Sequence, residues 1–131
     1  MRRSHLFFGL FSLLVFAGCA SASKELREAE KAYQGAHYED AITWFEALEG
    51  DVPRLSADER VRYHYYRGMS AYRLSDRDEA LYHLSLAREL AAHDRASLDS
   101  AAEAELKNLL EELTPKDASY RVDSGGEESR E

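Results

Sequence analysis

The chain has 131 residues, enough for one modest domain, and its formal net charge is −8. Its basic residues do not form a block, which excludes nucleic acid as an expected partner, because binding to phosphate requires a clustered basic surface. The sequence holds a single cysteine, so no disulfide can form within it.

The first element in chain order is an apolar head, predicted to be a secretory signal peptide over residues 1–18. Arg2 and Arg3 supply its positive start, and an apolar run follows from Leu6 to Ala17. This run is too short to span a bilayer as a helix, which takes about 20 apolar residues. Removing the head also removes both arginines, so the remaining chain carries a charge of about −10.

The apolar run ends in Phe16-Ala17-Gly18-Cys19, which resembles the lipobox of bacterial lipoproteins: an aliphatic residue, two small residues and a cysteine. The resemblance implies cleavage between Gly18 and Cys19, diacylglycerol on the Cys19 thiol and acylation of the new amine. Residues 19–23 would then form a lipidated tether. Phe16 departs from the family pattern, in which leucine is usual.

A competing cleavage site follows directly. Ala20-Ser21-Ala22 matches the pattern of ordinary signal peptide cleavage, and cutting after Ala22 would give a soluble periplasmic protein without Cys19. If the lipoprotein resemblance holds, Ala20 favours the outer membrane, since aspartate at that position favours retention in the inner one. The expected location is therefore the bacterial cell envelope, lipid-anchored and facing the periplasm.

From Lys24 to Leu113 apolar residues recur at helical spacing, which predicts an almost entirely helical body. A first helix is expected over 25–34 and a second from 38 to about 49, with a turn at 35–37 between them. A loop over 51–55 contains Pro53.

Ser56 and Glu59 have the spacing of a capping box, which predicts the start of a third helix that ends near residue 74. Asp76 and Glu79 repeat this pattern before a fourth helix through residue 90. A fifth helix is expected from about 98 to 113 and is stopped by Pro115. Residues 115–131 are polar and are predicted to form a disordered acidic tail.

The predicted helices contain an internal repeat at an offset of 39 residues. It pairs Ala29 with Gly68, Ala32 with Ala71, Tyr33 with Tyr72, Ala41 with Ala80 and Phe45 with Leu84. Small residues twelve apart, followed by a large residue, resemble the tetratricopeptide repeat, although the period of that family is about 34. The resemblance covers about half of the chain, from Leu26 to Leu90.

The resemblance implies an all-α fold of two tetratricopeptide-like hairpins plus a C-terminal capping helix, an α-solenoid fragment within residues 24–114. A generic pair of helical hairpins is the alternative. Because a solenoid usually needs three repeats, a homo-oligomer or a partner is a further possibility for completing the core.

No sequence motif predicts catalysis, a metal or a cofactor. His37, His64, His83 and His93 include no pair spaced three or four apart, so they are expected to be ordinary surface or turn residues. The acidic pairs lie at predicted helix starts, where a carboxylate interacts favourably with the helix dipole, or on solvated faces. We therefore expect neither an enzyme nor a metal site.

The expected function is a protein-protein interaction adaptor or scaffold, whose partner is another envelope protein or its extended segment. The tetratricopeptide resemblance implies partner contacts from the first helix of each hairpin, at Leu26, Glu30, Tyr33, Arg62, Tyr65, Met69, Tyr72 and Arg73. Tyrosine suits an interface because its ring is apolar and its tip polar, but each tyrosine has core packing as an alternative role. The alternative function is a self-associating structural lipoprotein with no separate ligand.

Overall fold

The structure, a computed structural model, describes the backbone of residues 16–94 and 96–115 and the side chains from Ser21 onward. These residues form five α-helices and one 3-10 helix, in the order α1 (Phe16–Gln34), α2 (Tyr38–Leu48), η1 (Glu49–Arg54), α3 (Ala57–Arg73), α4 (Arg77–Asp94) and α5 (Ser100–Leu113). The predicted all-α class is confirmed for this part of the chain. The head over 1–15, the side chain of Cys19 and the predicted tail beyond Pro115 lie outside the described residues.

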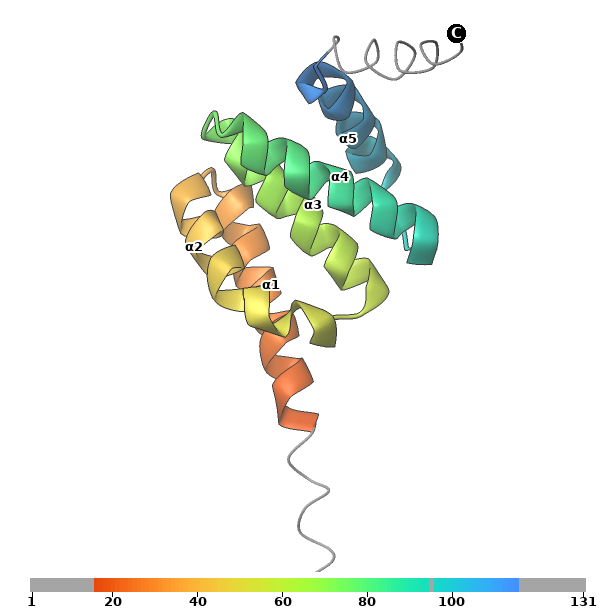
Figure 1. Ribbon diagram of the computed structural model, residues 1–131. Coiled ribbons are helices and arrows are strands. Elements are labelled where there is room, and N and C mark those ends of the chain that lie inside the picture. The colour runs from red at the N-terminus through yellow and green to blue at the C-terminus, as the bar shows by residue number, and fades with distance from the viewer. Residues whose placement is uncertain (1–15, 95, 116–131) are drawn as a thin grey trace, which may run out of the picture.

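Neighbouring helices along the chain pack together. Figure 1 shows α1 beside α2, and α3 and α4 as a second pair next to them. α5 lies against α4, on the side away from α1. None of the helices in the described part of the chain is both long enough and apolar enough to cross a bilayer.

The first helix starts earlier than the sequence predicted. α1 begins at Phe16 instead of Glu25, so residues 19–23, expected to be a tether, are helical. Ala22, Leu26 and Ala29 lie on one face at helical spacing and are all fully buried. The small residues around Cys19 carry little periodic signal, but alanine favours a helix and Ala22 extends the buried face by one turn.

The segment around Pro53 is the second difference. It was expected to be a loop and instead forms η1, in which the Leu55 amide donates to the Val52 carbonyl at 3.1 Å. Proline has no amide hydrogen to donate. A short 3-10 helix tolerates it because few of the amides in such a helix donate to carbonyls of the same helix.

The capping box at the start of α3 is confirmed. The Glu59 amide donates to Ser56 Oγ at 3.3 Å, and the Ser56 amide donates to Glu59 Oε2 at 3.0 Å. We expect Ser56→Ala to lower the free energy of unfolding by about 1 kcal/mol, because it leaves a helix-end amide without its acceptor. Urea denaturation measures this change, and Ser97→Ala, at an exposed loop position, is the control.

The two turns between paired helices share one backbone conformation at the offset of 39 residues. Ala36 and Ser75 have positive φ angles of 60° and 65°. The Ala36 amide donates to the Tyr33 carbonyl at 2.9 Å, and the Ser75 amide donates to the Tyr72 carbonyl at 3.0 Å. The next amide in each turn also matches: the His37 amide donates to the Ala32 carbonyl and the Asp76 amide donates to the Ala71 carbonyl, both at 2.9 Å. The repeat found in the sequence therefore extends to the hydrogen bonds of the turns.

The small residues of the repeat lie where paired helices approach closely. Ala29 and Ala41 are fully buried between α1 and α2, and Ala80 is fully buried in α4. At Gly68 a Cβ atom would lie 2.8 Å from Leu84 Cγ and 3.0 Å from the Leu84 backbone nitrogen. Only glycine allows α3 to approach α4 this closely at that point.

The core consists of two apolar clusters. The first joins α1, α2, η1 and α3 and contains Ala22, Leu26, Ala29, Ala41, Phe45, Leu48, Leu55 and Tyr63. The second joins α3, α4 and α5, and its α5 members are Ala102, Leu106, Leu109, Leu110 and Leu113. Tyr33 and Tyr66 pack against both clusters. α5 therefore covers the apolar side of the second helix pair.

Candidate functional site

The residues predicted to contact a partner divide into a buried and an accessible group. Leu26 and Met69 are fully buried and Tyr65 is nearly so, which leaves them no surface to offer a partner. These three residues pack in the two core clusters, because the side of each helix that was predicted to contact a partner also faces the core. The accessible group is Glu30, Tyr33, Arg62, Tyr72 and Arg73, all on α1 and α3.

Several of these accessible residues meet at one surface, which we call the tyrosine face and define as Glu30, Tyr33, Tyr38, Arg62, Tyr66 and Arg73. The Tyr33 ring lies 5.6 Å from the Tyr38 ring and 5.2 Å from the Tyr66 ring, centroid to centroid, and both pairs are tilted. All three tyrosines are half-buried. The sequence did not predict Tyr38 and Tyr66 as site residues, since the repeat relates only tyrosines on one side of the first helices.

Charged groups border these rings. Arg62 Nε lies 3.2 Å from Glu30 Oε1, without good hydrogen-bond geometry, and burial raises the pKa of the Glu30 carboxyl although Arg62 opposes this. Burial raises the pKa of Tyr33, while the nearby Arg73 guanidinium opposes that shift. The tyrosine face therefore offers aromatic rings beside charges of both signs, which suits a polypeptide partner better than a purely apolar ligand.

The α5 helix is attached to α3 beside this face. The Tyr65 hydroxyl donates to Glu105 Oε2 at 2.9 Å, and the Tyr72 hydroxyl donates to Glu112 Oε1 at 3.1 Å. Burial, together with Glu105, raises the pKa of Tyr65 far above its usual value. Tyr65 is thus a packing tyrosine and Tyr72 is partly engaged within the chain.

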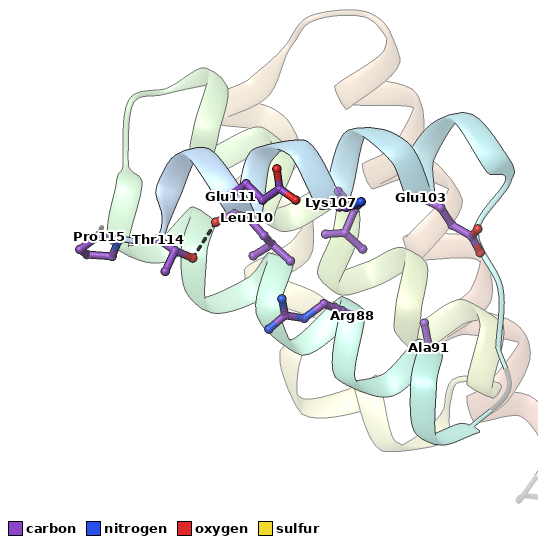
Figure 2. A pocket seen from close by; sticks show the side chains of 9 residues that line it. Arg88, Ala91, Glu103, Lys107, Leu110, Glu111, Thr114 and Pro115 are labelled. Atoms are coloured by element: carbon purple, nitrogen blue, oxygen red, sulfur yellow. Dashed lines mark hydrogen bonds between the residues drawn. The ribbon is translucent and has the colours of Figure 1, made fainter. Parts of the chain in front are cut away.

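A groove of about 630 Å³ lies between α4 and α5 (Figure 2). Arg88 and Lys107 lie along it together with the carboxylates of Glu103 and Glu111. Its leucines, Leu106 and Leu110, are only 5% and 3% exposed, because they already pack in the second core cluster. The exposed lining of the groove is nonetheless mostly apolar, with Ala91 and Pro115 contributing beside the charged side chains. It lacks exposed aromatic rings, and we therefore rank it second to the tyrosine face as a binding surface.

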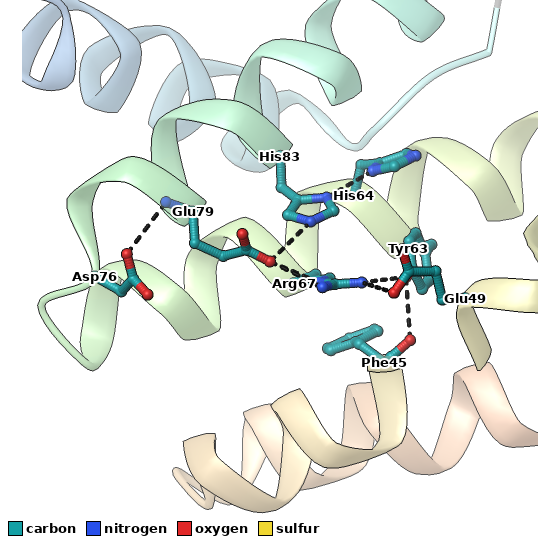
Figure 3. Close-up of polar contacts among 8 residues, drawn as sticks. All are labelled: Phe45, Glu49, Tyr63, His64, Arg67, Asp76, Glu79 and His83. Atoms are coloured by element: carbon teal, nitrogen blue, oxygen red, sulfur yellow. Dashed lines mark hydrogen bonds and ion pairs between the residues drawn. The ribbon is translucent and has the colours of Figure 1, made fainter. Parts of the chain in front are cut away.

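A buried polar cluster lies at the junction of the two helix pairs (Figure 3). Its centre is Arg67, whose residue is 8% exposed. Arg67 donates to Glu79 Oε1 on α4, at 3.2 Å from Nε and 2.9 Å from Nη2. Its Nη1 donates to the Tyr63 hydroxyl at 2.7 Å and to Glu49 Oε2 at 3.4 Å.

Tyr63 extends this network to the first helix pair, since its hydroxyl donates to the Phe45 carbonyl on α2 at 3.0 Å. Burial would lower the pKa of Arg67, but its contacts with Tyr63 and Glu79 outweigh this and raise it. Arg67 therefore stays charged and connects α3, α4 and η1.

His64 and His83 form part of the same cluster, which corrects the expectation that they are ordinary surface residues. Their Nδ1 atoms are 2.8 Å apart, and His83 is only 4% exposed. His83 Nε2 lies 3.1 Å from Glu79 Oε1. The sequence spacing hid this pair because the two histidines are on different helices. The pairs Tyr63–Arg67 and Glu79–His83, each spaced four apart, were the available signals.

Among the described side chains, no group of three or more His, Cys, Asp or Glu residues could hold a metal ion. No family model matches the chain, and no match is found among curated proteins or solved structures.

Proposed function

We propose that this chain is a lipid-anchored interaction module of the bacterial cell envelope, whose tyrosine face binds an extended segment of another envelope protein. The observation that carries the proposal is the row of half-buried rings at Tyr38, Tyr33 and Tyr66, bordered by Arg62 and Arg73. Such rings form large contacts at low entropic cost, and the arginines can pair with carboxylates or backbone carbonyls of an extended peptide.

The paired helices support a tetratricopeptide-like arrangement as part of this proposal. The offset of 39 residues is shared by the sequence, by the small residues between paired helices and by the turn hydrogen bonds. The tyrosine face is built mainly from α1 and α3, the first helices of the two pairs, and Tyr38 adds one ring from the start of α2. First helices are also where the family resemblance implies partner contacts.

The lipid anchor rests on the sequence around Cys19, and the extent of α1 is relevant to the choice of cleavage site. Ala22 is fully buried in the first core cluster. Cleavage before Cys19 keeps Ala22 in the domain, whereas cleavage after Ala22 removes it together with the start of α1. The retained packing favours processing at Cys19.

Metabolic labelling with palmitate tests the anchor. We expect the wild-type chain to incorporate label and to fractionate with membranes, and Cys19→Ala to lose both properties. Ala20→Ser is the control, because it keeps the cysteine and a small neighbour. Label that persists in Cys19→Ala, or a wild-type chain that carries none, would contradict lipidation.

Photo-crosslinking in cells tests the tyrosine face. A photoreactive residue at Arg73 is expected to give an adduct with a second envelope protein, and one at Arg54, an exposed arginine of η1 outside both this face and the α4–α5 groove, is the matched control. Adding Tyr33→Ala should reduce the adduct at position 73 about tenfold, the effect of losing roughly 1.4 kcal/mol of binding.

The size of the adduct separates the two proposed functions. An adduct containing two copies of this chain would favour the self-associating alternative. Equal adducts at positions 73 and 54, or none at position 73, would contradict binding through the tyrosine face. Thermal melts of each variant, measured in parallel, show whether a lost adduct reflects unfolding.

A further inference from the structure

The two histidines of the polar cluster meet edge to edge. Their Nδ1 atoms are 2.8 Å apart while the ring centroids are 5.1 Å apart, with an angle of 23° between the ring planes. The distance between the ring centroids exceeds the distance between the nitrogens by nearly two ring radii. Each Nδ1 atom therefore lies almost on the line that joins the two centroids, and the rings meet at their edges. This is the geometry of an in-plane N–H···N hydrogen bond, and a face-to-face stack would differ.

The neighbours of His83 determine which nitrogen carries the proton. Glu79 Oε1 accepts from His83 Nε2, so a neutral His83 has an unprotonated Nδ1. His64 must then donate from its own Nδ1 to His83 Nδ1. One hydrogen between the two nitrogens satisfies both neutral rings. When both rings are protonated, two N–H groups face each other at this distance, and the rings must separate.

We propose that the His64–His83 pair is an acid-sensitive device that loosens the junction between the α1–α2 pair and the α3–α4 pair when it is protonated. The connection runs through Glu79 Oε1, which accepts from His83 and from Arg67. Arg67 in turn contacts Glu49 of η1 and the Tyr63 hydroxyl, which holds the Phe45 carbonyl of α2. Displacing His83 therefore disturbs Glu79, the acceptor that orients Arg67, and Arg67 joins the two helix pairs.

Burial and Arg67 oppose added positive charge on the histidines, whereas the carboxylates of Glu79 and Glu49 favour it. The ionisable groups near them are Tyr63 and Arg67 on α3, Glu79 and Tyr82 on α4, and Glu49 on η1. Burial, with smaller contributions from His83 and Arg67, lowers the pKa of His64 to about 4. Burial and Arg67 lower the pKa of His83 to about 4, while Glu49 acts in the opposite direction. A cavity of about 390 Å³ beside the pair gives protons access to it.

The direction of the pH effect follows from these values. A free histidine titrates near 6.5, so the unfolded chain binds more protons than the folded chain between pH 6.5 and about 4. The folded state therefore loses stability as the pH falls through this window, and it suffers no such penalty above 6.5. The junction should respond before the rest of the molecule, because the histidines contact it directly.

The test uses the full-length chain in detergent micelles, melted at pH 7.5 and at pH 4.5. We expect the wild-type Tm to fall by roughly 20 °C between these values. The double variant His64→Gln/His83→Gln should show less than half of that fall. The exposed His93 provides the matched control, and His93→Gln should behave as the wild type does.

Trp44 gives a local readout, because it is the single tryptophan and directly precedes Phe45 in α2. Its fluorescence should change as the pH falls from 6.5 to 3.5, through the pKa of about 4 of the folded pair, while the helical circular dichroism signal is unchanged. If the double variant does not fold, the single His64→Gln variant, which keeps the His83–Glu79 contact, replaces it. An equal fall of Tm in wild type and variant, or a Trp44 signal that changes only with global unfolding, would overturn the proposal.

Discussion

Arg67→Ala is expected to lower the free energy of unfolding by about 3 kcal/mol, among the largest effects of a single exchange at a polar residue in this chain. The substitution removes the two hydrogen bonds that Glu79 Oε1 accepts from Arg67, at 3.2 Å from Nε and 2.9 Å from Nη2. It also removes the donor to the Tyr63 hydroxyl, which keeps only the bond that it donates to the Phe45 carbonyl. Tyr63 is 1% exposed, so water cannot replace the lost donor. Chemical denaturation of wild type and variant measures the loss.

Arg54→Ala is the matched control for this prediction. Arg54 Nη1 also contacts a carboxylate, Asp51 Oδ1, at 2.6 Å, but its side chain is 60% exposed. An exposed ion pair of this kind contributes about 0–1 kcal/mol, so Arg54→Ala should be close to neutral. A similar loss in both variants would show that burial of the Arg67 cluster does not determine its contribution.

Glu79 allows the Arg67 contact to be separated from its surroundings. Glu79→Ala and the double variant Arg67→Ala/Glu79→Ala complete a double-mutant cycle. We expect the double variant to lose less than the sum of the single losses, because removing both partners leaves no unpaired charge behind. Additive losses would mean that Arg67 and Glu79 do not stabilise each other.

Gly68→Val should destabilise the chain by about 3 kcal/mol through overpacking. The new Cβ would lie 2.8 Å from Leu84 Cγ and 3.0 Å from the Leu84 backbone nitrogen, so a shift of the Leu84 side chain alone cannot relieve the contact. The helix propensity gained on replacing glycine, less than 1 kcal/mol, does not offset this cost. The thermal midpoint should fall accordingly.

Gly50→Val is the control, since no atom lies within 4 Å of a Cβ built at Gly50. Its free energy of unfolding should change by less than about 0.5 kcal/mol, as is usual for exposed sites. If Gly68→Val were equally neutral, the close approach of α3 and α4 would not be a constraint on this fold.

The helices after Gln34 were largely predictable because local chemistry fixes their ends. Ser56 caps α3 as its spacing to Glu59 indicates, and Pro115 follows the end of α5. α4 was predicted to residue 90 but continues to Asp94, since no proline or glycine stops it. The start of α1 was not predictable from periodicity, because its small residues are compatible with several conformations.

The candidate sites were predicted less well because they depend on tertiary contacts. The helical stripe chosen for a partner contained Leu26 and Met69, which the core uses. Sequence spacing could not show that His64 and His83 face each other across two helices, nor that Arg67 lies beneath the surface. Periodicity identifies which face of a helix is apolar, but it does not say which neighbour covers that face.

The early start of α1 has a consequence for the proposed mature protein. After cleavage at Cys19, the helix would begin at the new N-terminus, where its first amides have no carbonyl partners. A free amine there would place a positive charge at the positive end of the helix dipole, at a cost of about 0.3–1 kcal/mol. An acyl group removes that charge and supplies a carbonyl oxygen as acceptor. The fatty acid would then act as a helix cap as well as an anchor, so maturation itself would strengthen the fold.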